Sequence, residues 1–146
     1  MRKQIISVAA ALLFSIVVAG QCGAQQAVGV IEVNVPFAFQ AGNRVLPAGE
    51  YRIQRLSAEM DGIQLIRESD GKASMVVTTM PLEPTDKTAP PRLVFYRYGN
   101  AYFLTQIWTD GTHGRHLHRS AREKELASTL GRTEVAVMAH GVAAGL

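Results

Sequence analysis

The chain has 146 residues, and its 15 basic and 12 acidic side chains give a formal net charge of +3 at pH 7. A charge this small, without a block of basic residues, argues against nucleic acid as a partner. The single cysteine excludes an intramolecular disulfide framework, and the length suits one domain held by an ordinary hydrophobic core.

The first residues carry the pattern of an export signal. A Met-Arg-Lys start is followed by the apolar run Ile5–Val18, which is shorter than the roughly 20 residues that a membrane-spanning helix needs. Small residues then predict cleavage after Ala24, with a cut after Gly20 as the alternative. We therefore expect a signal peptide over residues 1–24. The mature chain is expected to work in the periplasm or outside the cell, without a transmembrane segment.

Cys22 raises the question of lipidation. Lipoprotein signals place Gly, Ala or Ser directly before the modified cysteine, whereas this chain has Gln21 there, so a lipid anchor is not expected. Signal removal also takes away Arg2 and Lys3, which lowers the net charge to about +1. Because the cysteine leaves with the signal, a thiol mechanism is excluded as well.

Alternating apolar residues predict strands along the mature chain. Residues 31–39 place an apolar side chain at every odd position. This two-residue period is typical of a strand with one solvent-exposed face. Pro36 cannot donate a ladder hydrogen bond, which predicts a sheet edge or a bulge there. Further strands are predicted over residues 51–54, 63–67, 73–79, 92–98, 101–108 and 134–139.

Turn residues separate these strands. Asp-Gly pairs at 61–62, 70–71 and 110–111 predict hairpin turns, because glycine adopts positive φ easily. Residues 81–91 hold four of the six prolines and predict a stiff surface loop. Gly99-Asn100 predicts a two-residue hairpin turn. Its register would pair Tyr98 with Ala101, Arg97 with Tyr102, Tyr96 with Phe103 and Phe95 with Leu104.

One helix is predicted near the C-terminal end. Ser120 and Glu123 form a capping box, and Gly131 closes the segment. We expect the charged residues 122–125 to face solvent and a narrow apolar stripe to lie on a sheet, formed by Leu126, Ala127 and Leu130. Together these elements predict an all-β fold for residues 25–146: a single antiparallel β-sandwich or barrel of about seven to eight strands with one C-terminal-region α-helix.

Both faces of the predicted hairpin are apolar, so each needs a cover. One face is expected to gather Val94, Tyr96, Tyr98, Phe103 and Ile107. The other is expected to gather Leu93, Phe95, Tyr102, Leu104 and Trp108, with Arg97 near Tyr102. We expect the helix to cover Phe95, Leu104 and Trp108, because it follows shortly after them. Without that cover, these three residues with Arg97 and Tyr102 would form a ligand or partner surface.

Several motifs resemble those of a family of small secreted proteins from acidobacterial-type soil bacteria. The motifs are VPFAF at 35–39, LPAGEY at 46–51 and RYGNAYFL at 97–104, supported by Gly114-Arg115 and residues 120–127. The resemblance implies an exported β protein, and it implies no catalytic activity or ligand. This chain departs from the family pattern near His116 and His118, where Glu and Pro are more frequent.

Candidate chemistry is concentrated in three histidines. His113, His116 and His118 lie within six residues, and in an extended chain His116 and His118 point the same way, a spacing that zinc or copper could use. The alternative interpretation is three solvated loop histidines. The sequence has no Gly-x-Ser-x-Gly turn and no glycine-rich phosphate loop, and its acidic residues fall mainly in turns.

These observations favour a non-catalytic, extracytoplasmic binding or structural module that needs no cofactor. Its partner is expected to be a glycan or a protein of the envelope or the extracellular space. The alternative is a metal-dependent enzyme or metal-binding protein that uses His113, His116 and His118. Neither hypothesis identifies a ligand.

Overall fold

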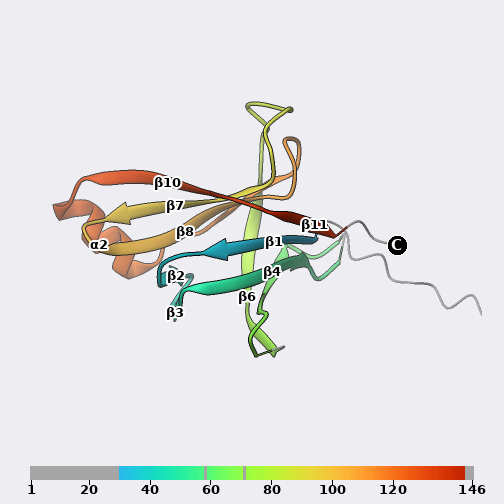
Figure 1. The fold of residues 1–146 in the computed structure, drawn as a ribbon. Helices are drawn as coiled ribbons and strands as arrows, with labels where there is room; N and C mark the ends of the chain where they lie inside the picture. Colours follow the sequence, from blue (N-terminus) through green and yellow to red (C-terminus); the bar gives the residue numbers. More distant parts are fainter. Residues whose placement is uncertain (1–29, 58, 71, 144–146) are drawn as a thin grey trace, which may run out of the picture.

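The computed structural model describes residues 30–57, 59–70 and 72–143, so the predicted signal segment, its cleavage site and Cys22 lie outside the described residues. The described part is mostly β, with one helix, α2 (Ala121–Thr129), where a helix was predicted (Figure 1). The all-β prediction is therefore confirmed. The strands are β1 (Val30–Val35), β2 (Phe39–Ala41), β3 (Arg44–Leu46), β4 (Gly49–Arg55), β5 (Gly62–Arg67), β6 (Lys72–Leu82), β7 (Arg92–Tyr98), β8 (Ala101–Trp108), β9 (Gly114–Leu117), β10 (Arg132–Met138) and β11 (Gly141–Ala143).

The described residues form eleven strands, more than the seven to eight predicted. Strands β2, β3 and β11 have three residues each, too few for an alternating pattern to show. The strand predicted over residues 31–39 does not run past Pro36 with an edge position or a bulge: β1 ends just before this proline, which cannot donate a ladder hydrogen bond, and the chain resumes as β2 three residues later. The side chains at the odd positions of β1 are fully buried, which confirms the predicted buried face of this strand.

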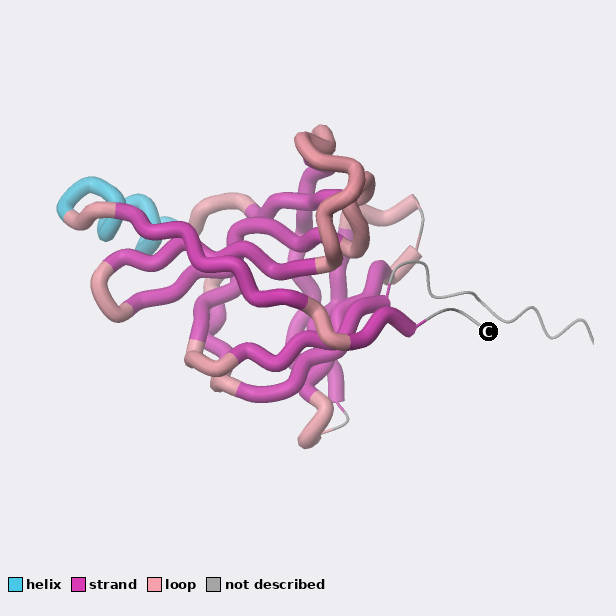
Figure 2. Tube along the Cα trace, turned by 45° about the horizontal axis from the view of Figure 1, so that its top comes forward, coloured by secondary structure: helices cyan, strands magenta, loops and turns pink. Residues whose placement is uncertain are grey.

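The strands follow the order β10-β7-β8-β9-β6-β5-β4-β1-β11, with β2 and β3 beside β8. All pairs are antiparallel except a single parallel bridge between Gln40 and Phe103. The first and last strands of this order are consecutive in the chain, because only residues 139–140 separate β10 from β11. The sheet therefore bends back on itself around the core (Figure 2).

The bent sheet has two halves. The first half contains β1, β4, β5, β11 and the start of β6, and the second contains β7 to β10, the β2–β3 hairpin and the end of β6. Figure 1 shows β6 crossing from one half to the other. The main core lies between them and is built from inner-face residues of both: Ile31, Val33, Val35, Phe39, Ala41, Leu46, Tyr51, Ile53, Ile63, Leu65, Val77, Leu93, Phe95, Leu104, Ile107 and Leu117.

The hairpin of β7 and β8 follows the predicted register only near its turn. Tyr98 to Phe95 face Ala101 to Leu104 as predicted, and positive φ at Gly99 alone fits a type II′ turn. Beyond Phe95 the register shifts, because Thr105 is an extra residue whose hydroxyl donates to the Val94 carbonyl at 3.0 Å. A one-residue shift exchanges the two faces. The predicted places of Ile107 and Trp108 were therefore wrong.

After the bulge, Ile107 points into the main core beside Leu93, whereas Trp108 lies on the outer face opposite Arg92. The Arg92 guanidinium carbon stands 5.0 Å from the centre of the Trp108 ring. Phe95 and Leu104 remain in the main core, where Phe95 packs edge-on against Phe39 at 5.3 Å. The β2–β3 hairpin and the first half of the sheet, which meet in the main core, thus cover this face of the hairpin, and the helix does not.

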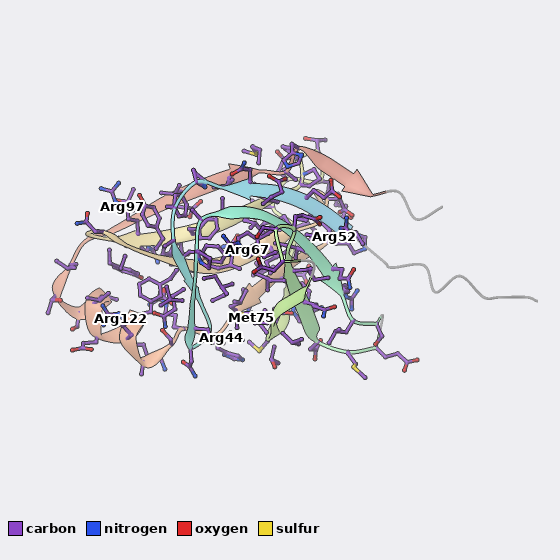
Figure 3. The ribbon with its side chains drawn as sticks, turned by 60° about the horizontal axis from the view of Figure 1, so that its bottom comes forward. Arg44, Arg52, Arg67, Met75, Arg97 and Arg122 are labelled. Atoms are coloured by element: carbon purple, nitrogen blue, oxygen red, sulfur yellow. The ribbon has the colours of Figure 1, made fainter. Side chains whose placement is uncertain are left out.

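Helix α2 lies on the outer face of the second half instead. The N-cap hydroxyl of Ser120 accepts from the Glu123 backbone at 3.1 Å, as predicted. The Glu123 side chain faces the sheet and accepts from the Tyr98 hydroxyl at 3.3 Å, while Leu130 is 45% exposed. The predicted orientation was therefore wrong, because a carboxylate is the buried residue of this helix. In Figure 3, Arg97 and Arg122 lie at this end of the molecule and Arg52 lies toward the other.

Candidate functional site

The five residues of the predicted aromatic surface do not share one exposed face. Phe95, Leu104 and Trp108 are buried, which confirms that they are covered. Tyr102 is half-buried and stacks on Phe37, with ring centres 3.8 Å apart. Arg97 is exposed, with its guanidinium carbon 6.0 Å from the centre of the Tyr102 ring.

His113 separates from the other two histidines, whereas the rings of His116 and His118 stay neighbours. His116 lies on the outer face of β9, where it faces Met80 and Gln106 of the neighbouring strands. The exposed His118 ring lies 6.2 Å from it, at an angle of 64°. His113 turns to Asp110, with Nδ1 and Oδ2 2.8 Å apart. Within the described ranges, no three His, Cys, Asp or Glu side chains come together in a group that could hold a metal ion.

A pocket of about 130 Å³ opens between the two halves, at the end of the sheet away from the β7–β8 turn. Residues from five strands and one loop meet there, since β4 ends, β5 begins, β6 ends and the chain passes from β8 to β9. Its lining combines apolar, hydroxyl and cationic side chains: Arg55, Ile63, Pro81, Leu82, Ile107, Thr109, Thr112, His113, Gly114 and Arg115.

Arg115 is fixed in the pocket wall by both halves of the sheet. Its Nε donates to the Thr79 hydroxyl at 2.6 Å, and its Nη2 donates to the Thr79 carbonyl at 3.1 Å and to Asp61 Oδ1 at 2.5 Å. Asp61 is itself held, because its carbonyl accepts from the Thr79 backbone and hydroxyl. The Arg115 side chain is only 12% exposed, so its charge is presented in a set position.

The opposite wall is a tight turn around Asp110. Its carboxylate accepts from the Thr112 backbone and hydroxyl, both at 2.6 Å, and from the His113 backbone at 2.8 Å. Burial raises the pKa of Asp110, but the hydrogen bonds from Thr112 and His113 outweigh burial and hold the pKa well below its ordinary value. The turn that carries Thr112 and His113 therefore keeps its shape at neutral pH.

The proline-rich loop supports this turn, and Figure 1 shows the two loops side by side. A Cβ at Gly111 would stand 2.2 Å from the Lys87 carbonyl oxygen, so only glycine fits there. The predicted reason for the Asp-Gly pairs was positive φ, but neither Gly62 nor Gly111 has it, and Gly71 lies outside the described residues. The connections at 61–62 and 110–111 are confirmed, because each falls between antiparallel neighbours.

Sequence reasoning missed the cationic part of this pocket. Arg115 lies on the inner face of β9, the same face as the buried Leu117 two residues later. A charged residue two positions from a buried one in a strand could have indicated this inward-facing arginine from the sequence. Arg55 and Ile63, which face each other across β4 and β5, meet Arg115 only through the fold. The arrangement offers fixed positive charge, hydroxyl groups and an apolar wall, which suits recognition of a small polar molecule.

The described residues contain no helix that is both long and apolar enough to cross a membrane. No protein-family model matches the chain, and neither a curated protein nor a solved structure does.

Proposed function

We propose that the protein is an exported, non-catalytic binding module that takes a small ligand in the pocket between the two halves of the sheet. The observation that carries this proposal is the convergence of Arg55, Arg115 and His113 with hydroxyl and apolar side chains around one cavity. Ligand sites are concave, mostly preformed and lined by apolar groups with a few placed polar ones. This pocket has that composition on a small scale.

The hydrogen bonds around the pocket favour binding over catalysis. A general base must be able to accept a proton near the working pH. Asp110 is poorly suited to that role, because its pKa lies well below the ordinary value and its carboxylate already accepts several hydrogen bonds. Arg115 is a cationic hydrogen-bond donor that Asp61 and Thr79 hold in place. Such groups orient a ligand and do not exchange protons with it.

The export part of the proposal rests on the sequence. The positively charged start, the apolar run Ile5–Val18 and the small residues that follow have the composition of a signal peptide. The resemblance to small secreted bacterial proteins points the same way. Intact-mass measurement of the exported chain is expected to give an N-terminus at Gln25. A mass that includes lipid on Cys22 would contradict this expectation.

The binding function is tested by a fragment screen on residues 25–146 with two-dimensional NMR. We expect some fragments to shift the amide signals of pocket residues such as Ile107, Thr112 and Arg115. The variant Thr112→Trp places a bulky ring in the lining and is expected to abolish these shifts. Thr133→Trp is the matched control, because Thr133 is exposed on β10. A screen in which fragments bind elsewhere, or in which both variants bind equally, would overturn the proposal.

A further inference from the structure

The ionisable side chains of the pocket lining are all basic. Two arginines and one histidine line it, and none of the lining residues is an acid. The acids that partner Arg115 and His113 stand outside the lining: Asp61 is 66% exposed and bonds one nitrogen of Arg115, and Asp110 is occupied by the turn. A concave surface with this balance favours a negatively charged group.

The Arg115 guanidinium keeps N–H donors with which it can bind a negatively charged group. Its hydrogen bonds to Asp61 and Thr79 use Nε and Nη2, and Nη1 takes part in none of them. The Thr112 hydroxyl in the same lining already donates to Asp110, and the Thr109 hydroxyl donates to the His113 carbonyl, so Arg115 is the donor left for a ligand. Arginine is a common residue for holding a carboxylate, because its planar fork of N–H donors is rigid.

The size and the remaining wall of the pocket restrict the rest of the ligand. A volume of about 130 Å³ holds more than one water but is well below the roughly 300–1,000 Å³ of pockets for drug-sized molecules. Ile63, Leu82 and Ile107, with Pro81, form the apolar part of the lining. A short aliphatic chain would bury its surface there, whereas a sugar or a peptide would be too large and too polar.

Building on the proposed binding function, we propose that the pocket takes a small aliphatic carboxylic acid. Its carboxylate binds the Arg115 side of the pocket, and its short apolar chain packs on Ile63 and Ile107. The apolar wall favours aliphatic carboxylates over inorganic anions. An inorganic anion would gain the charge interaction with Arg115 but would leave the apolar wall in contact with water.

The test compares 3-methylbutanoate with its isosteric amide, 3-methylbutanamide, and with inorganic phosphate on residues 25–146. Titration followed by NMR at pH 7 is expected to show pocket binding of the carboxylate that is at least about tenfold tighter than that of the amide or of phosphate. The variant Arg115→Lys keeps the charge but loses the planar fork, and is expected to weaken carboxylate binding by about tenfold. Arg97→Gln is the control, because Arg97 lies at the hairpin tip, and is expected to leave binding unchanged.

If Arg115→Lys disturbs folding, a pH series on the wild type takes its place. Carboxylate binding is expected to fall as the ligand itself is protonated, below about pH 5, while amide binding stays constant. Equal binding of amide and carboxylate, preference for phosphate, or no pocket binding of the carboxylate would each overturn the ligand class. The binding module itself would be overturned separately, by a fragment screen that finds no pocket ligand of any class.

Discussion

The two halves of the sheet share one core but present very different outer faces. On the first half, Arg52 bridges Glu32 at 3.5 Å and Glu68 at 3.2 Å, and the Gln54 amide donates to Gln64 at 2.9 Å. On the second half, the outward side chains are buried too: Val94, Tyr98 and Phe103 are 2% exposed and Trp108 is 5% exposed.

This difference shows where each half obtains its stability. The first half needs one cover, the main core, and water solvates its other face. The second half needs a second cover, which the helix, three arginines and Gly114 supply. Arg132 and Arg119 stand 4.3 and 5.9 Å from the ring centre of Tyr96, and the Gly114 backbone lies against the Trp108 ring. The outer layer of the second half is thus a small core of its own.

The largest expected effect comes from truncating an outward residue of the second half. Phe103→Ala would empty the space where its ring packs edge-on against Tyr98, at 5.8 Å, and should lower the free energy of unfolding by about 3–5 kcal/mol. Val76→Ala is the matched change on the outer face of the first half, where Val76 is 50% exposed, and should stay within about 0.5 kcal/mol. Urea unfolding measures both. Equal costs would mean that the two outer faces do not differ.

The second prediction concerns the backbone that covers Trp108. A Cβ at Gly114 would stand 2.4 Å from the Trp108 ring, so Gly114→Ala must displace that ring and should cost about 1–3 kcal/mol. Gly131→Ala is the control, because a Cβ added there would meet nothing within 4 Å. Tryptophan emission gives a second measurement: a red shift is expected in Gly114→Ala alone. Unchanged emission and stability would contradict the close packing.

The difference between the two outer faces also determined how well the sequence predicted which side chains point inward. In β1 and β4 one face is polar, so the alternation of residues fixed which side chains point inward, and Ile31, Val33 and Tyr51 are buried as expected. In β7 and β8 both faces are apolar, so a pattern of apolar residues cannot reveal a register shift. Thr105 marks the bulge without glycine or proline, and no local signal placed Ile107 and Trp108 correctly.

The helix and the pocket depended on tertiary contacts that local patterns do not contain. The Ser120 cap is a local hydrogen bond and was predictable. The inward direction of Glu123 depends on Tyr98, which lies 25 residues earlier in the chain. The pocket likewise joins Arg55 to Arg115, and only the closure of the bent sheet brings them together.

A third, smaller effect is expected at the turns of the two halves. Asp110→Asn removes a charged acceptor of backbone and hydroxyl donors and should cost about 1 kcal/mol at neutral pH. Because the folded-state pKa of Asp110 is lowered, its contribution is present above the unfolded pKa, near pH 4, and is lost as the pH falls toward the folded value. Asp70→Asn, in the first-half turn, should change little, since the Arg67–Asp70 ion pair at 3.6 Å is exposed.

The smallest effect expected at neutral pH is at the carboxylate under the helix. Burial raises the pKa of Glu123, although Arg119, the Tyr98 hydroxyl and Arg132 act in the opposite direction. A raised pKa means that the folded state binds more protons than the unfolded state between the two pKa values. The stability contributed by this group therefore falls as the pH rises through that window, and its ionised form is the less favourable one above it.

Glu123→Gln tests this sign, because the amide oxygen can still accept from the Tyr98 hydroxyl while the charge is gone. At pH 7 the variant should be at least as stable as the wild type, and its advantage should shrink as the pH is lowered toward 4, where the wild-type carboxyl becomes protonated. Glu68→Gln, on the wet face of the first half, is the control, and its ion pair with Arg52 should contribute little. Urea unfolding at pH 4 and 7 decides the question. A variant that is clearly less stable at pH 7 would mean that attraction to Arg119 and Arg132 exceeds the cost of burying the charge.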